Sequence, residues 1–166
     1  MKKLLILGLL LSTALFQSCS INENPQPITN ELLAEVFEVK AEFTSGNSFR
    51  NYYNLNPVIF DSDVLLVYEF VGLDKTGADI WKPLPQIYTS ENGIHQYNFD
   101  FTKVDFSIFL DANFDRMRLN NSWRLGKVFR VVIVPGKFAK MIDKNNLQNV
   151  MNTLKLTESS VVDLSK

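Results

Sequence analysis

Two segments of this chain are almost continuously apolar, and they constrain the fold more than any other feature of the sequence. Residues 64–71 and 128–134 consist mainly of leucine, valine, isoleucine and aromatic residues, and a glycine or a proline-glycine pair follows each of them. Runs this short, and this rich in β-branched and aromatic side chains, are typical of strands that are covered on both faces rather than of helices. We therefore expect both segments to be central strands.

Five further segments are predicted to be strands. Residues 35–43, 95–101 and 104–110 alternate apolar and polar side chains, and 49–55 follows a turn signal as a partner strand. Residues 81–88 have strand character, but Pro83 and Pro85 cannot donate hydrogen bonds to a ladder, so this segment is predicted to be an edge strand or a bulged one.

The C-terminal part of the chain changes to a helical period. Leu147, Val150, Met151 and Leu154 are spaced as one face of a helix, with Asn145 and Gln148 as a predicted capping pair. The whole pattern predicts an all-β fold, a seven-stranded antiparallel β-sandwich that is immunoglobulin-like in the broad sense, with one short C-terminal helix. A small barrel is the alternative architecture.

The first nineteen residues predict export and a lipid anchor. Lys2 and Lys3 give a positively charged start, residues 4–16 form an apolar core, and Cys19, the only cysteine in the sequence, follows Ser18. This core is too short for a permanent membrane-spanning helix and is typical of a secretory signal. The arrangement resembles a bacterial lipoprotein signal, in which that cysteine is lipidated. A secreted protein with a free Cys19 is the alternative, but an exposed thiol is prone to oxidation, and acylation removes that liability while it supplies membrane affinity.

The predicted organisation of the chain therefore has three parts. Residues 1–18 are the signal peptide, residues 19–31 are the lipidated cysteine and a flexible tether, and residues 32–166 are a single β-sandwich domain. The tether contains Pro25 and Pro27, and it would span roughly 3.1 Å per residue where it is polyproline-like.

Five local strings within residues 62–136 resemble a family of small Bacteroidota lipoproteins. They are Asp63-Val-Leu-Leu-Val-Tyr68, Trp81-Lys-Pro-Leu-Pro-Gln86, Tyr97-Asn-Phe-Asp-Phe101, Ile108-Phe-Leu-Asp-Ala-Asn-Phe-Asp115 and Val128-Phe-Arg-Val-Val-Ile-Val-Pro135. Some similar proteins carry a collagen-like run after the lipidated cysteine, whereas here the short tether occupies that place. The resemblance implies an exported, lipid-anchored β domain, and it implies no particular activity.

Composition and motifs argue against several classes of function. The formal net charge of −1 becomes −3 once Lys2 and Lys3 are removed, and no basic stripe exists, so a nucleic-acid partner is not expected. His95 is the only histidine and Cys19 is assigned to the lipid, so the usual zinc ligands are missing. No phosphate-binding loop, dinucleotide fingerprint or redox dithiol is present, so no cofactor and no metal are predicted. His95 is expected to line a strand face rather than to act as a base.

Asp111, Asn113 and Asp115 have the spacing that opens an EF-hand calcium loop. That loop needs a glycine in its sixth position and a bidentate glutamate in its twelfth, where this chain has Arg116 and Ser122. We therefore interpret the segment as a turn capped by aspartate side chains.

Residues 111–126 form the longest polar interval of the domain and are the predicted recognition loop. Its arginines outnumber its aspartates, and aromatic and arginine side chains are favoured anchors in binding. A positive, aromatic patch would suit an anionic partner such as a sulfated or acidic glycan. In the alternative interpretation the aromatic residues plug one end of the sandwich and the arginines only solvate the loop. The predicted binding residues are Phe114, Arg116, Arg118, Trp123 and Arg124.

These observations lead to two hypotheses about function. The first is a lipid-anchored protein of the outer membrane, facing either the periplasm or the exterior, that acts as a non-enzymatic binding or structural module for an envelope protein or a glycan. The second is a hydrolase that acts on an envelope or dietary glycan through carboxylates paired across strands. The sequence identifies no catalytic residue for the second.

Overall fold

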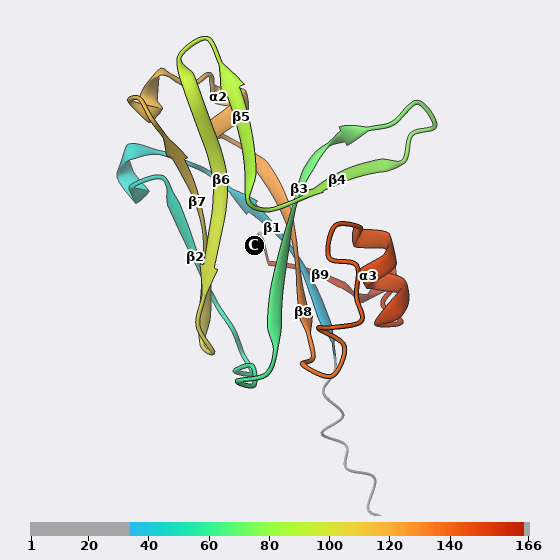
Figure 1. The fold of residues 1–166 in the computed structure, drawn as a ribbon. Coiled ribbons are helices and arrows are strands. Elements are labelled where there is room, and N and C mark those ends of the chain that lie inside the picture. Colours follow the sequence, from blue (N-terminus) through green and yellow to red (C-terminus); the bar gives the residue numbers. More distant parts are fainter. Residues whose placement is uncertain (1–33, 165–166) are drawn as a thin grey trace, which may run out of the picture. The chain divides into compact units, whose positions relative to one another are not determined.

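A computed structural model describes residues 34–164, which form two β-sheets packed against each other (Figure 1). The five-stranded sheet has the order β4-β3-β8-β1-β9, and the four-stranded sheet has the order β2-β7-β6-β5. The predicted all-β sandwich with a short C-terminal helix is confirmed. The signal peptide, Cys19 and the tether lie outside the described residues.

The bounds of the strands are as follows. The five-stranded sheet contains β1 (Glu35–Ala41), β3 (Val64–Leu73), β4 (Asp79–Pro83), β8 (Lys127–Val134) and β9 (Val161–Asp163). The four-stranded sheet contains β2 (Arg50–Asn54), β5 (Gln86–Ser90), β6 (Gly93–Phe101) and β7 (Asp105–Ala112). Short helical segments connect them, namely η1 (Ser45–Asn47), η2 (Arg116–Arg118), α2 (Asn121–Arg124), α3 (Leu147–Thr153) and η3 (Glu158–Ser160). Within this part of the chain no helix has the length and apolar character needed to cross a membrane.

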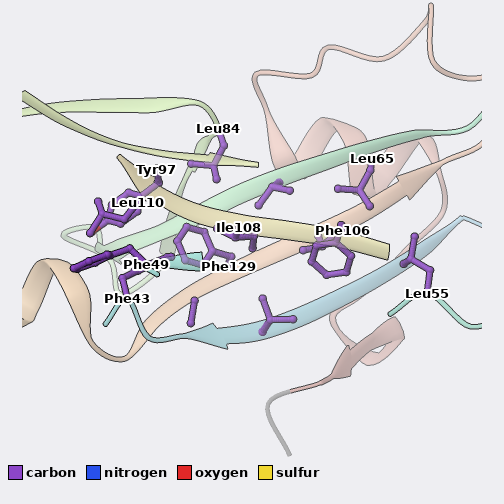
Figure 2. Packing of buried hydrophobic residues seen from close by; sticks show 14 of the residues in the cluster. Phe43, Phe49, Leu55, Leu65, Leu84, Tyr97, Phe106, Ile108, Leu110 and Phe129 are labelled. Carbon is purple, nitrogen blue, oxygen red and sulfur yellow. The ribbon is translucent and has the colours of Figure 1, made fainter. Parts of the chain in front are cut away.

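The main core fills the space between the two sheets (Figure 2). Phe129 of β8 and Tyr97 of β6 face each other from opposite sheets, with ring centroids 5.7 Å apart. Phe43, which follows β1, lies 5.5 Å from Tyr97 and 6.2 Å from Phe129. Aromatic rings in such tilted and edge-to-face pairs add packing energy beyond the apolar area that they bury.

Strand β8 explains why the segment 128–134 is almost continuously apolar. Val131 is fully buried in the main core, whereas Val132 is fully buried in a second core on the other face of the same sheet. Successive side chains of a strand point to opposite faces, so a strand with a core on each side has no solvent-facing position. The prediction that 128–134 is a central strand is therefore right, and β3, which pairs with β8 and β4, is likewise central.

Helix α3 covers that second core. Leu147, Val150 and Met151 are buried against the sheet, which confirms the predicted helical period. The predicted capping pair is wrong, because Asn146 is the N-cap and its side chain accepts a hydrogen bond from the Asn149 amide at 3.0 Å.

The structure has nine strands in the described residues where the sequence predicted seven, and two findings account for the difference. First, the predicted strand 81–88 is two strands, because β4 belongs to one sheet and β5 to the other. Pro83 and Pro85 interrupt the ladder, and the chain passes between the sheets at the buried Leu84. Second, the chain after α3 forms β9, which pairs parallel to β1. The sandwich is thus antiparallel except at this one pair.

Candidate functional site

The predicted recognition loop is largely ordered by its own polar side chains. Its first two residues, Asp111 and Ala112, still belong to β7, and η2 and α2 follow. The Asp115 carboxylate accepts a hydrogen bond from the Met117 amide at 2.9 Å, and the Asn120 side chain accepts one from the Ser122 amide at 2.9 Å. The expected turn with an aspartate cap is therefore present. No cluster of potential metal ligands was found among the residues that the structure describes.

The three arginines of the loop lie in different surroundings. Arg124 is buried, and its guanidinium donates to the Leu119 carbonyl oxygen at 3.0 Å and to the Asn121 side chain at 2.7 Å. The guanidinium of Arg116 lies 4.3 Å from the Phe49 ring centroid and 3.2 Å from a backbone carbonyl oxygen. Arg118 is exposed. The structure thus does not bring the arginines together into one patch. Arg124 instead stabilises the loop through hydrogen bonds to Leu119 and Asn121.

The two aromatic residues of the loop face inward. Trp123 and Phe114 are half-buried and pack against the main core, with their ring centroids 4.6 Å and 6.5 Å from that of His95. Trp123 also lies 4.8 Å from the Tyr88 ring of β5. Phe114 is therefore a plug at this end of the sandwich, whereas Trp123 in addition borders a cleft.

This cleft, which we call the lysine cleft, has a volume of about 420 Å³. It opens between strands β3, β4 and β5 on one side and the segment that joins α2 to β8 on the other. The lining residues that matter for its chemistry are Glu69, Phe70, Lys82, Tyr88, Trp123 and Lys127.

A buried ion pair forms the floor of the lysine cleft. The Glu69 side chain is only 1% exposed, and its two carboxylate oxygens receive the Lys127 ammonium at 2.9 Å and the Tyr88 hydroxyl at 2.8 Å. The Lys127 ammonium also lies 5.3 Å from the Tyr97 ring centroid and 5.8 Å from that of Trp123. Every polar atom of the pair that faces the interior therefore has a partner, as burial of charge requires.

Tyr88 and Lys82 form the wall of the cleft. Burial, and secondarily the hydrogen bond to Glu69, raises the pKa of the Tyr88 phenol, so this hydroxyl remains a donor. The Lys82 ammonium lies 5.5 Å from the Tyr88 ring centroid and makes no ion pair with another described residue. Two lysines and one carboxylate leave one positive charge in excess at the cleft.

His95 lies behind the cleft in the main core. It is fully buried, and neither ring nitrogen has a hydrogen-bond partner among the described residues. Burial, and then the nearby Lys127 charge, lowers the pKa of this imidazole, which favours the neutral form. His95 thus lines the inner face of β6, as the sequence predicted.

Sequence reasoning found one member of the cleft, Trp123, and missed Glu69, Lys82, Tyr88 and Lys127. The sequence did contain a signal for Glu69, because it is the only charged residue in the apolar segment 64–71. A lone carboxylate in a strand buried on both faces needs a specific partner, but the sequence does not say which distant residue supplies it. Comparison of the chain with models of protein families, with curated proteins and with solved structures found no match.

Proposed function

We propose that this protein is an exported, lipid-anchored binding module of the outer membrane that holds an acidic ligand in the lysine cleft. Support for the anchor comes from the sequence alone, from the positively charged start, the short apolar core and the single Cys19. The resemblance to Bacteroidota lipoproteins agrees with the same address.

The observation that carries the binding proposal is the buried Glu69–Lys127 pair at the floor of an open cleft. Burial of an ion pair costs desolvation energy of several kcal/mol per ion, and apolar residues of similar volume generally serve stability as well or better. Retention of the pair at a cleft floor therefore favours a role in ligand recognition. Glu69 also fixes the positions of the Lys127 ammonium and the Tyr88 hydroxyl, so the remaining N–H donors of the ammonium point to a defined place.

The excess positive charge and the aromatic walls define the class of ligand. Lys82 has no carboxylate partner among the described residues, so an anionic group of a ligand would supply one. Trp123 and Tyr88 offer apolar ring surface beside this charge. A sugar with a carboxylate or sulfate group combines an anion with an apolar ring face, and we propose an acidic glycan as the ligand.

The alternative function, a glycan hydrolase, has less support at this site. Glycoside hydrolysis generally uses two carboxyl groups placed about 5–9.5 Å apart across the scissile bond. Glu69 is the only carboxylate in the lining of the lysine cleft, and both of its oxygens already have partners. The arrangement is that of a binding site with a fixed floor.

Calorimetric titration with a galacturonic acid trimer tests the ligand. We expect saturable binding that weakens about tenfold in Lys82→Gln, which corresponds to about 1.4 kcal/mol, and that largely returns in Lys82→Arg. Lys103→Gln is the control, because it removes the same charge from an exposed lysine that lies outside the cleft, in the turn between β6 and β7, where it pairs with Asp61 at 2.9 Å. Absence of binding, or equal binding by wild type and Lys82→Gln, would overturn the proposal.

Cell fractionation tests the anchor separately. Replacement of Cys19 by alanine removes the predicted acylation site, so the protein is expected to move from the membrane fraction to the soluble fraction. Equal membrane retention of the Cys19→Ala variant would exclude the lipid anchor without bearing on the cleft.

A further inference from the structure

A second, larger cleft lies on the opposite side of β4 from the lysine cleft. It has a volume of about 640 Å³ and is bounded by β4, by the start of α3 and by Arg130 of β8. Because successive residues of a strand point to opposite faces, Lys82 lines the lysine cleft while its neighbour Trp81 packs on the α3 side. We call this second site the amide cleft, since the asparagines and the glutamine at the start of α3 form one of its walls.

Arg130 is the fixed charged group of the amide cleft. Its guanidinium binds the Glu38 carboxylate at 3.0 Å and the Glu158 carboxylate at 2.8 Å, and it lies 4.4 Å from the Trp81 ring centroid. Arg130 is only 4% exposed, yet its Nε atom has no hydrogen-bond partner within residues 34–164. An unpartnered buried donor is uncommon in proteins and is accounted for where water or a ligand supplies an acceptor oxygen.

The exposed wall of the amide cleft also contains polar side chains with unused hydrogen-bond donors and acceptors. The Asp79 carboxylate and the Asn145 side-chain amide form no hydrogen bond or ion pair with another described residue. Gln148 uses its amide nitrogen on Asn152 at 2.9 Å, and its amide oxygen remains available. These side chains offer both donors and acceptors, which is the pattern that hydroxyl groups of a sugar require.

The net charge of the amide cleft is opposite to that of the lysine cleft. Asp79, Glu158 and the adjoining Glu38 outnumber the single Arg130, so an anionic ligand is disfavoured and an ammonium group is favoured. We propose that the amide cleft binds an amino sugar. The ammonium pairs with Asp79 and Glu158, the hydroxyls meet the side-chain amides, an oxygen accepts from Arg130 Nε and the ring lies against Trp81.

The two tryptophans of the chain allow the two clefts to be observed separately. Trp81 borders the amide cleft and Trp123 the lysine cleft, so each indole N–H signal in a heteronuclear NMR spectrum reports on one site. A Trp123→Phe variant assigns the two signals. Titration of the full domain at pH 6 with a fully deacetylated glucosamine trimer is expected to shift the Trp81 signal to saturation and to leave that of Trp123 in place.

Three comparisons decide the proposal. Acetylation of the trimer removes the ammonium groups and is expected to weaken binding at least tenfold. Asp79→Asn is expected to weaken it several-fold, whereas Glu91→Gln, which changes an exposed carboxylate in the β5–β6 turn, leaves it unchanged. No saturable shift at Trp81, no effect of Asp79→Asn, or equally tight binding of a trilysine peptide would overturn the assignment to an amino sugar. The outcome is independent of binding at the lysine cleft.

Discussion

The lysine cleft and the amide cleft share one strand, β4, but they are built in opposite ways. In the lysine cleft the charged pair is inside, with side-chain exposures of 1% for Glu69 and 15% for Lys127. In the amide cleft one partner is inside and one is outside, since the side chain of Arg130 is 5% exposed and that of Glu158 is 73% exposed. The first cleft therefore has a rigid charged floor, and the second has a rigid base with an adaptable polar wall.

This difference shows that a salt bridge has no fixed energetic value. Water screens an exposed pair, whose contribution to stability is typically about 0–1 kcal/mol. A buried pair is screened little, and loss of one partner leaves an uncompensated charge that costs about 3–5 kcal/mol. Similar distances, 2.9 Å in one cleft and 2.8 Å in the other, thus predict different consequences of mutation.

The largest effect is expected from a substitution that unfolds the central strand β8, which contributes residues to both clefts. Val131 is fully buried in the middle of β8, between β3 and β1. Val131→Asp buries an unpaired carboxylate, which costs several kcal/mol against a total stability of about 5–15 kcal/mol. The variant is expected to lose its cooperative thermal transition in circular dichroism, and an unchanged melt would show that β8 is not central.

Neutralising one carboxylate in each cleft tests the comparison directly. Glu69→Gln leaves the Lys127 ammonium buried without its counterion, so the free energy of unfolding is expected to fall by about 3 kcal/mol. Glu158→Gln removes an exposed carboxylate while Glu38 still pairs with Arg130, so a loss below about 1 kcal/mol is expected. Urea denaturation measures both. Equal losses in the two variants would contradict the distinction.

The sequence predicted those parts of the fold that depend on neighbouring residues, and it failed where contacts join distant segments. Alternation, apolar runs, the helical period and turn signals depend on neighbouring residues. Alternation and apolar runs identified β1, β3, β6, β7 and β8, a turn signal indicated β2, and the helical period identified α3. The change of sheet after Pro83 and the docking of β9 on β1 depend on contacts between distant segments, and no local pattern encodes them. Asn145, Asn146 and Gln148 are all polar, so the pattern could not show which of them caps α3.

The site was harder to predict because its residues come from four separate segments. Glu69 and Lys127 are distant in sequence from each other and from Lys82 and Tyr88, and only the fold brings these side chains together. The recognition loop was predicted from its length, its aromatic residues and its arginines, yet Arg124 is buried within it and Arg116 packs over Phe49. Trp123 was predicted as a binding residue, with a plug at the end of the sandwich as the alternative. It packs against the main core, and its binding role remains a prediction.

An intermediate effect is expected at Trp123, which serves both the core and the lysine cleft. Trp123→Ala removes ring contacts with Tyr88 and His95 but empties a half-buried position, so a loss of about 2 kcal/mol is expected, below the roughly 3–5 kcal/mol of a fully buried aromatic. Trp123→Phe keeps an apolar ring, so its thermal transition is expected to lie within a few degrees of wild type. Weaker capture of the galacturonic acid trimer by the stable Phe variant would assign Trp123 to the site, whereas unchanged capture would leave it a purely structural residue.

The smallest effect concerns how stability changes with acid. A titrating residue behind the lysine cleft, His95, is compared with a residue of the amide cleft that does not titrate, Gln148. Burial, followed by Lys127, lowers the pKa of His95 from 6.5, so the folded state prefers the neutral imidazole and the unfolded state binds the proton first. The stability that depends on neutral His95 is complete above pH 6.5 and is lost as the pH falls from there through the lowered pKa of the folded state. His95→Phe removes this proton linkage, so the fall in unfolding free energy between pH 7.5 and pH 5.5, measured with urea, is expected to be smaller than in wild type. Gln148→Ala, on the amide-cleft side, removes no titrating group and is expected to keep the wild-type slope. If the His95→Phe slope equals that of wild type, the acid response arises elsewhere in the chain.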